Sequence, residues 1–455
     1  MSPSPKHILL LGSGYVAKPT AEFILRRPEN HLTIACRRIE AAQELTKILG
    51  SDRVKAISLD VMDEAALDAA MEKHDLAVSL IPYIHHARVI ESAIRKKKHV
   101  VTTSYVNPQM QALNDKAKEA GITCMNEIGL DPGIDHLYAV KTIEEVHKAG
   151  GQLKSFLSYC GGLPAPEASN NPLGYKFSWS SRGVLLALRN TAKWLENGKV
   201  REVSGTDLMD MAKPIFIYPA FAFVGYANRD STPYSERYRI PECETILRGT
   251  LRYQGFPRFI KALVILGFLQ DESVDYLASA DPASPPAWKD VLAKMTGASA
   301  NDEASLKAAV LSKIPDTGED AERIIDGIRW LGLFSDTPVI PRGGNPLDTL
   351  CATLEQKMAY GPKERDMVML QHRFDIQKAD GTPEVRTSTL LAYGVPGGDT
   401  AMATTVGIPC GISVQLILDG KLNIPGVIAP MTMDICGPII EELEKEGISC
   451  EEAIL

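Results

Sequence analysis

The chain has 455 residues, of which 45% are hydrophobic and 23% charged, and its formal net charge at pH 7 is −8. A chain of this length is expected to form two or three domains around a large buried core, and the composition is that of an ordinary enzyme. The acidic balance argues against a broad nucleic-acid-binding surface.

The eight cysteines include no C-x-x-C pair, and the nine histidines show no H-E-x-x-H spacing. This scatter favours reduced thiols over a disulfide framework or a zinc site, so we expect no metal. Residues 1–5 lack the apolar segment of a secretory signal, and no stretch is predicted to be long and apolar enough to cross a bilayer. We therefore expect a cytoplasmic protein without a membrane partner.

The first predicted element is a short apolar strand over residues 7–11, with the pattern of a strand buried on both faces. It is followed at once by a G-x-G-x-x-A sequence made of Gly12, Ser13, Gly14, Tyr15, Val16 and Ala17. In a dinucleotide-binding loop the first glycine permits a tight turn, and the second lets backbone N–H groups approach a pyrophosphate. The alanine lets the next helix lie close to the sheet, and the helix N-terminus attracts the phosphates. An ordinary glycine turn fits the same sequence, so the interpretation depends on whether a second strand completes the unit.

A second strand is predicted over residues 31–36, where a βαβ unit requires one. A cofactor with a free ribose 2′-hydroxyl would be matched by an Asp or Glu roughly 20 residues beyond the glycines. This chain has Cys36, Arg37 and Arg38 there instead. Two guanidiniums suit a 2′-phosphate, which indicates NADP(H). The alternative is that both arginines are simply solvated.

Strands and helices continue to alternate as far as residue 126. Helices are predicted at 41–49, 63–71 (with Asp63 as its cap), 87–97 and 108–120, and strands at 54–59, 75–81, 99–103 and 122–126. Six strands with crossover helices predict a Rossmann-type, doubly wound parallel sheet, in which ligands bind beyond the carboxyl ends of the strands. The cofactor contacts expected at those ends are Asp60, Val61, Ile81, Thr103 and Ser104.

The segment from Glu127 to Asp135 leaves the sixth strand, and its glycines and proline preclude regular structure. Asp135 is predicted to be the N-cap of a helix that runs to about residue 148. The segment must pass over the nicotinamide end, so we expect Leu130 and Asp131 to contact the cofactor at the floor of a cleft between domains. The alternative for Asp131 is that it only caps a turn.

A second α/β unit with a mixed sheet is predicted from about residue 153. Its strands are expected at 155–160, 215–218, 244–253, 367–376 and 384–393, the last two forming a hairpin through Asp380-Gly381. A long polar loop at 161–175 has the length of a functional loop. Residues 257–360 have a mostly helical pattern, with a polar linker at 278–286, and indicate an inserted all-helical subdomain.

The carboxyl-terminal part contains a long apolar helix pattern at 401–418, a short link at 423–430 and a terminal helix at 438–446. By analogy with two-domain dehydrogenases, we expect this tail to return to the cofactor domain.

Three motifs give the chain a resemblance to a known family. They are the glycine loop at 12–17, the segment 126–136 and the segment 158–166, and the stretches 175–183 and 248–253 extend the likeness over essentially the whole chain. The chain resembles the fungal saccharopine reductases, the NADP-dependent, glutamate-forming saccharopine dehydrogenases of lysine biosynthesis. The resemblance implies reversible, NADPH-dependent condensation of L-glutamate with L-2-aminoadipate 6-semialdehyde to saccharopine.

The resemblance also implies a homodimer of three-part subunits. The predicted parts are an NADP-binding domain (1–130 and 397–455), a substrate-binding and dimerisation domain (131–256 and 361–396) and a helical subdomain (257–360). Ser180, in the motif 175–183, is predicted to contact the cofactor.

Saccharopine is a secondary amine with three carboxylates, so the site should supply guanidiniums and hydroxyls. The candidate substrate-binding residues are Ser104, Tyr105, Asp131, Arg229, Arg248, Thr250 and Arg252. Each arginine has a structural ion pair as its alternative role.

Formation and dehydration of the imine require proton transfers, and so a titratable group. Asp131 is the first candidate for the general acid–base, followed by Tyr105 and Cys160. A water molecule relayed by the substrate's own carboxylates is the alternative.

Three other functions compete with this interpretation. A carboxyspermidine-type dehydrogenase would need acidic walls for its cationic substrate where Arg229 and Arg252 are expected. A lysine-forming saccharopine dehydrogenase is usually NAD-linked, which Arg37 and Arg38 argue against. A non-catalytic NADP-sensing regulator would need no second domain with an arginine-lined pocket.

Overall fold

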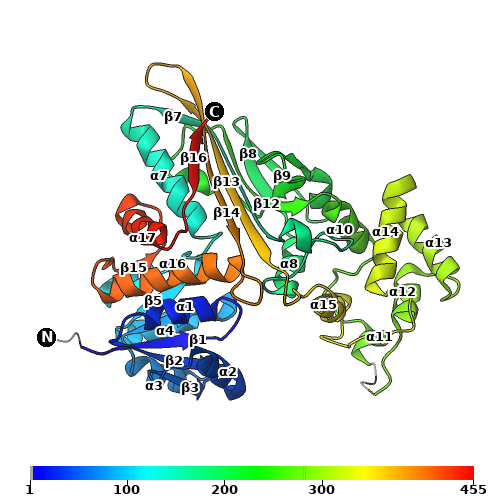
Figure 1. Cartoon of the computed structure of the whole chain (residues 1–455), viewed down its shortest axis with the longest axis horizontal. Helices are drawn as coiled ribbons and strands as arrows, with labels where there is room; N and C mark the ends of the chain where they lie inside the picture. The colour runs from blue at the N-terminus through cyan, green and yellow to red at the C-terminus, as the bar shows by residue number, and fades with distance from the viewer. Residues whose placement is uncertain (1–3, 280, 282) are drawn as a thin grey trace.

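The computed structural model describes residues 4–279, 281 and 283–455. Two sheets lie beside each other, with long helices packed between and around them, and a group of helices extends from the far side of the second sheet (Figure 1). The predicted α/β class, with a parallel sheet and a mixed sheet, is confirmed.

The first sheet is parallel and has seven strands in the order β15-β6-β5-β4-β1-β2-β3. Its strands are β1 (Lys6–Leu11), β2 (Asn30–Cys36), β3 (Val54–Ser58), β4 (Leu76–Ser79), β5 (His99–Thr102), β6 (Thr123–Met125) and β15 (Gly426–Ile428). The six predicted strands are confirmed. The seventh was missed, because the link expected at 423–430 contains β15, which pairs with β6.

The helices of this domain are α1 (Ala17–Leu25), α2 (Ile39–Leu49), α3 (Glu64–Glu72), the 3-10 turn η1 (Tyr83–His85), α4 (His86–Lys96), α5 (Pro108–Gln111) and α6 (Asn114–Glu119). The Asp63 carboxylate caps α3, as predicted, by accepting from the Ala66 N–H at 3.0 Å. The single helix predicted at 108–120 is wrong. The Leu113 N–H bonds the carbonyl of Met110, three residues back, and this tighter turn separates α5 from α6.

The apolar helix predicted at 401–418 is α16 (Ala401–Leu418), and it packs against α1. By length and by a mean hydropathy of 1.6 it is apolar enough to cross a membrane, so the expectation that no stretch meets this test was wrong. Because 72% of the helix is buried inside the protein, its apolar sequence is explained by its place in the core.

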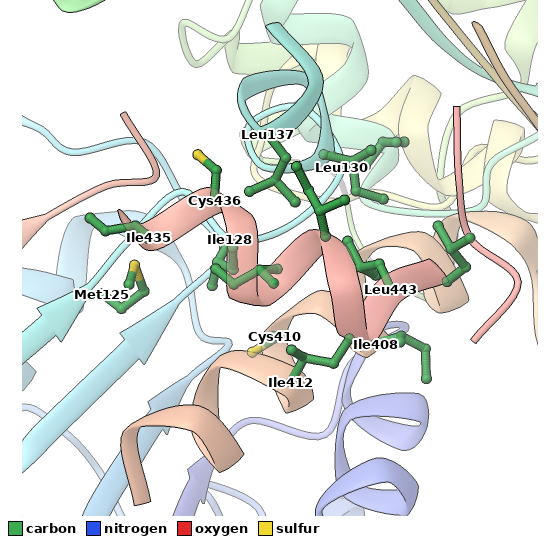
Figure 2. Packing of buried hydrophobic residues seen from close by; sticks show 14 of the residues in the cluster. Met125, Ile128, Leu130, Leu137, Ile408, Cys410, Ile412, Ile435, Cys436 and Leu443 are labelled. Atoms are coloured by element: carbon green, nitrogen blue, oxygen red, sulfur yellow. The ribbon is translucent and has the colours of Figure 1, made fainter. Parts of the chain in front are cut away.

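The carboxyl-terminal helix α17 (Met433–Lys445) packs on both α16 and α7 (Ile134–Lys148). Figure 2 shows the buried side chains that meet there: Met125, Ile128, Leu130, Leu137, Ile408, Cys410, Ile412, Ile435, Cys436 and Leu443. The tail therefore returns to the cofactor domain, as expected, and joins it to the helix that leads into the second sheet.

The second sheet is mixed, in the order β10-β11-β12-β7-β13-β14-β16, with β8 and β9 paired beside β12. Its strands are β7 (Gln152–Pro164), β8 (Ala192–Glu196), β9 (Lys199–Val203), β10 (Lys213–Ile215), β11 (Phe223–Ala227), β12 (Thr245–Tyr253), β13 (Asp366–Gln377), β14 (Pro383–Tyr393) and β16 (Glu451–Ile454). Strand β7 runs to Pro164, so the polar loop begins later than predicted. The strand predicted at 215–218 is wrong beyond its first residue, because β10 ends at Ile215 and a bend and turn follow it, and strands β8, β9, β11 and β16 were missed.

The region predicted to be helical contains α10 (Phe256–Ile265), α11 (Asp275–Ala278), α12 (Trp288–Thr296), α13 (Glu303–Lys313), α14 (Gly318–Leu331) and α15 (Pro346–Lys357). Shorter helices are η2 (Pro166–Ala168), α8 (Ser181–Ala187), η3 (Leu208–Met211) and α9 (Tyr234–Arg237). The linker predicted at 278–286 includes residues 280 and 282, which lie outside the described residues. The three-part division stays a prediction, although the last strand, β16, pairs with β14 in the second sheet.

The contact between α1 and α16 depends on a glycine. A Cβ atom at Gly407 would lie 2.9 Å from the Val16 carbonyl oxygen and 2.9 Å from the Pro19 Cβ. Alanine normally stabilises a helix relative to glycine, but we expect Gly407→Ala to lower the free energy of unfolding by about 1–3 kcal/mol because of this crowding. The denaturation midpoint measures the change. Ser312→Ala, at an exposed position of α13, is the control, and should shift stability by less than about 0.5 kcal/mol. A stabilised Gly407→Ala variant would contradict the close packing.

Candidate active site

The loop between β1 and α1 has the geometry of a dinucleotide cradle. Gly12 has a φ angle of +103°, and a Cβ there would lie 2.8 Å from the Leu80 carbonyl oxygen, so only glycine fits. A Cβ at Gly14 would meet nothing within 4 Å, which leaves its backbone open to a ligand. The Cys36 thiol donates to Ser13 Oγ at 3.3 Å and ties the end of β2 to the loop. These features fit a bound pyrophosphate at the N-terminus of α1.

Two cationic side chains follow β2 beside this loop. Arg37 and Arg38 are exposed, and within the described chain neither forms an ion pair. The Asp60 carboxylate, which follows β3, accepts from the Met62 N–H at 2.9 Å and so holds a turn. The unpaired guanidiniums are free to bind a 2′-phosphate. The other predicted contacts here are half-buried Val16, Val61 and Ile81, and Tyr15, which is 64% exposed.

The ends of β5 and β6 bring together the residues expected at the nicotinamide end. The Glu127 N–H donates to the Ser104 carbonyl at 3.1 Å, and a Cβ at Gly129 would lie 3.4 Å from the Cβ of Thr103. Leu130 is buried beside them in the core. The segment after β6 therefore lies against the end of β5, as the sequence predicted.

Asp131 lies at a junction between the two sheets. The Tyr105 hydroxyl donates to its Oδ1 at 2.6 Å, and the Arg248 Nη2, from β12, donates to the same oxygen at 2.5 Å. Burial raises the pKa of Asp131, and so does the neighbouring Asp135 carboxylate, against the opposing effect of Arg248. One oxygen of Asp131 is thus fixed by two donors. Its Oδ2 has no hydrogen-bond partner in the part of the chain that the structure describes.

Asp135 was predicted to be an N-cap, and this was wrong. Helix α7 begins at Ile134, and its N-cap is Gly133. Asp135 Oδ1 accepts from the Gly133 N–H at 2.6 Å, and Oδ2 accepts from Arg248 Nη2 at 2.5 Å. Burial opposes ionisation, but His136, Arg248 and the Gly133 N–H together lower the pKa of Asp135. Asp135 is therefore the ionised partner of Arg248, whereas Asp131 is the carboxyl group closer to protonation.

A buried network supports this junction from behind. Glu127 is fully buried, and its Oε2 accepts from Arg237 Nη2 at 2.8 Å and contacts His136 Nε2 at 2.9 Å. His136 Nδ1 lies 2.7 Å from the Tyr238 hydroxyl. Burial opposes ionisation of Glu127, but His136 and Arg237 lower its pKa to about 2. The network fixes α9 of the second domain against the exit from β6.

The predicted substrate arginines have three different environments. Arg248 is buried, paired with two carboxylates, and bonded to the Tyr234 hydroxyl. Arg229 is exposed, and its guanidinium lies 5.3 Å from the centre of the Tyr105 ring. Arg252 is 6% exposed and lies 4.8 Å from the centre of the Tyr175 ring. Among the described residues, Arg229 and Arg252 have no carboxylate partner.

The remaining candidates lie on the second sheet or beyond it. Thr250 is in register with Cys160 on the neighbouring strand β7. Burial raises the pKa of the Cys160 thiol well above its usual value, and so do Asp131 and Asp135, which disfavours a thiolate. Ser180 is the N-cap of α8, where its Oγ accepts from the Gly183 N–H at 3.1 Å. No hydrogen bond in the described chain joins Ser180 to the glycine loop.

Several residues of the site were missed from the sequence. Glu127, Asp135 and His136 lie within the recognised segment 126–136, so their position was known but their role was not. Tyr234, Arg237 and Tyr238 belong to one short turn of helix, and no local pattern marked them. His86 was also missed: it is buried at the start of α4, with its ring nitrogens 2.8 Å from Ser79 Oγ and 3.0 Å from Ser104 Oγ.

A phosphate-binding glycine loop, cations at the end of β2 and a charged junction with a second α/β unit define a NADP-dependent oxidoreductase. Residues 8–125 match the model of the saccharopine dehydrogenase NADP binding domain, and residues 129–448 match that of the saccharopine dehydrogenase C-terminal domain. The chain belongs to the saccharopine dehydrogenase family, as the resemblance indicated.

Known proteins resemble this chain over nearly its full length. The chain is 61% identical to saccharopine dehydrogenase [NADP(+), L-glutamate-forming] of Schizosaccharomyces pombe, covering 98% of this chain and 99% of that protein. It is 57% identical to the protein of the same name from Pyricularia oryzae, covering 99% of each. The apo, histidine-tagged saccharopine dehydrogenase (L-Glu forming) from Saccharomyces cerevisiae matches with a TM-score of 0.91 and 55% identity, covering 99% of this chain and 100% of that one.

The first prediction from this site concerns cofactor choice. Arg37→Asp should weaken NADPH binding far more than NADH binding, since each lost charged hydrogen bond to the 2′-phosphate costs about 1.5–3 kcal/mol. Titration of both cofactors measures the difference. Lys47→Asp makes the same change of charge in the last turn of α2 and is the control. Equal losses for the two cofactors would contradict the assignment of Arg37.

The second prediction concerns Glu127. Its pKa is about 2 in the folded protein against a usual 4.5, so its contribution to stability is complete above pH 4.5 and is lost as the pH falls toward 2. Glu127→Gln should lower the free energy of unfolding by about 3 kcal/mol at pH 7, and by less at pH 4. Denaturation midpoints at both pH values measure this, with the exposed Glu72→Gln as the control. If Glu127→Gln lowered the free energy of unfolding equally at both pH values, the lowered pKa of Glu127 would be contradicted.

Proposed function

We propose that this chain catalyses the reversible, NADPH-dependent condensation of L-glutamate with L-2-aminoadipate 6-semialdehyde to saccharopine, in the aminoadipate route of lysine biosynthesis. The observation that carries the proposal is the 61% identity, over nearly all of both chains, to an enzyme named for the NADP(+)-linked, L-glutamate-forming reaction. The geometry of the candidate active site supports it, because the site offers both anion-binding and proton-transferring groups.

The cofactor is held by the glycine loop, with Arg37 and Arg38 at its 2′-phosphate. When bound, NADPH supplies the two-electron reduction of the imine carbon. The residues after β5 and β6, with Ser104, Tyr105 and Asp131 among them, hold the reacting carbon beside the nicotinamide and limit its motion.

The carboxylates of the substrate bind the two arginines that have no carboxylate partner in the described structure. Arg252 is buried and stacked on Tyr175, so it can hold one carboxylate away from water, where a charged hydrogen bond is strongest. Arg229 is exposed beside Tyr105 and binds a second carboxylate at the rim. Arg248 has its charge already balanced by Asp131 and Asp135, and we assign it the role of holding Asp131 in place.

Asp131 is the general acid–base. Its Oδ2 is free to exchange a proton with the carbinolamine or the imine nitrogen, while Tyr105 and Arg248 fix Oδ1. Its raised pKa brings the carboxyl group closer to the neutral range in which proton transfer is efficient. Cys160 is a weaker candidate, because burial keeps its thiol protonated.

The alternatives fit the site less well. The site has two carboxyl groups, Asp131 and Asp135, and three guanidiniums, those of Arg229, Arg248 and Arg252, so it offers no net negative wall for a polyamine. A lysine-forming, NAD-linked enzyme conflicts with the unpaired Arg37 and Arg38. A sensor without catalysis would not need a carboxyl group held with one oxygen free.

We also propose a cytoplasmic homodimer. All eight cysteines are free thiols, which suits a reducing compartment. Ile454, the last residue of the outermost strand β16, is 68% exposed, and Leu455 after it is 72% exposed, at one edge of the second sheet where a second copy can bind. Light scattering on the purified chain tests the dimer, and cell fractionation tests the compartment.

The assay that tests the function follows the absorbance of NADPH with L-glutamate and the semialdehyde, and with saccharopine and NADP+ in reverse. We expect turnover in both directions, and lower activity with NADH or with L-lysine and 2-oxoglutarate. No turnover with either pair of substrates would contradict the proposal.

Asp131→Asn keeps the shape of the side chain but removes its titration. If Asp131 is the general acid–base, kcat should fall about 10²- to 10⁴-fold, and one limb of the pH–rate profile should disappear. Asp366→Asn is the control, since burial also raises the pKa of Asp366, which instead binds the N–H groups of Ala401 and Met402. An Asp131→Asn variant with normal kcat and an unchanged pH profile would transfer the role to Tyr105, Cys160 or bound water.

A further inference from the structure

The hydroxyl of Ser104 is held from inside the cofactor domain by a buried histidine. His86, the first residue of α4, is fully buried, with Nδ1 2.8 Å from Ser79 Oγ and Nε2 3.0 Å from Ser104 Oγ. Ser79 is the last residue of β4 and is also fully buried, whereas Ser104 is partly exposed. The three side chains form a line from the interior of the sheet to the candidate active site.

The direction of the hydrogen bonds in this line follows from counting donors. Burial lowers the pKa of His86 to about 4, so at pH 7 the ring is neutral and carries one proton. In the described structure His86 is the one hydrogen-bond partner of Ser79 Oγ. If the proton were on Nδ1, the Ser79 hydroxyl would be a buried donor without an acceptor, at a cost of about 1–3 kcal/mol.

The other tautomer leaves no donor unpaired. Ser79 then donates to the bare Nδ1 of His86, and the Nε2–H of His86 donates to Ser104 Oγ. An unused lone pair on Ser79 costs less than an unpaired O–H. The proton of Ser104 therefore has no acceptor within the line, and it points to whatever binds at the carboxyl end of β5.

We propose that His86 and Ser79 are positioning residues that make Ser104 a hydrogen-bond donor to the bound ligand. The group so recognised is an acceptor oxygen, namely a substrate carboxylate or the cofactor's carboxamide carbonyl. The inference rests on the proposed function, in which Ser104 contacts substrate and cofactor.

The kinetic test uses two variants of His86 and a matched control. His86→Leu removes both hydrogen bonds at similar volume, whereas His86→Gln can keep an N–H near the position of Nε2. The control is His74→Leu, because His74 is also buried in this domain, with its ring nitrogens near the Ala70 carbonyl and Thr33 Oγ1. His86→Leu should raise the KM of one ligand about 3- to 12-fold with little change in kcat. His86→Gln should bring that KM most of the way back to the wild-type value. His74→Leu should change the stability of the protein but neither KM nor kcat.

The ligand whose KM rises identifies the acceptor: saccharopine indicates a substrate carboxylate, and NADP+ indicates the carboxamide. In a Ser104→Ala background, His86→Leu should raise KM no further, because the two residues act through one hydroxyl. If His86→Leu behaves like His74→Leu, or if its effect is fully retained in the Ser104→Ala background, the proposal is overturned.

A second measurement is made on the wild-type protein, so it depends neither on enzymatic activity nor on whether a variant folds. In wild-type protein labelled with ¹⁵N-histidine, the His86 ring should show a protonated Nε2 and a bare Nδ1 at pH 7. A protonated Nδ1 would overturn the proposal whatever the kinetics. If wild-type protein does not turn over saccharopine, the proposed function fails, and the tautomer still decides the direction of the hydrogen bonds.

Discussion

The buried guanidinium of Arg248 is the constraint that shapes this active site. A charge removed from water is tolerated only when it is paired and hydrogen-bonded, and Arg248 reaches from β12 of the second sheet to Asp131 and Asp135 beyond the first sheet. Neither side can be buried alone, because each would leave an unbalanced charge. The pairing therefore holds the two sheets together at the place where the carboxyl ends of the parallel strands meet the second domain, and it fixes the position of Asp131 relative to the cofactor loop.

The ion pairs of Arg248 distinguish it from the other arginines of the candidate site. Once Arg248 is neutralised by carboxylates, it has little charge left for another anion, whereas Arg229 and Arg252 have no carboxylate partner among the described residues and keep their charge. The two carboxyl groups are divided in the same way. Asp135 accepts the Gly133 N–H and the guanidinium, and its pKa is lowered, whereas burial raises the pKa of Asp131. The pKa values of two acidic residues four positions apart are thus shifted in opposite directions, and both oxygens of Asp135 accept a hydrogen bond whereas only Oδ1 of Asp131 does in the described structure.

The sequence predicted those parts of the site that depend on local structure. The strand, the glycine loop and the cations after β2 follow one another within about 30 residues, as in any βαβ unit, so their arrangement could be derived directly. Asp131 was chosen as a candidate because it follows the sixth strand. The network of Glu127, His136 and Arg237 could not be derived, since its members come from segments about 100 residues apart. The short strands β15 and β16 were missed for a related reason: they are strands because β6 and β14 offer them an edge to pair with.

Two residues of the site show how the surroundings fix the backbone. Glu127 and Arg229 have φ angles of +58° and +55°, in the left-handed region that long side chains rarely occupy. Each is held by contacts that the local sequence does not supply. The Glu127 side chain is bound by His136, Arg237 and the Val106 N–H, and the Arg229 carbonyl accepts from the Lys193 N–H of β8 at 2.8 Å. Such conformations persist only when the structure around them compensates their cost. These contacts are internal to the chain, so the fold itself holds the backbone at Glu127 and Arg229, on either side of the candidate active site.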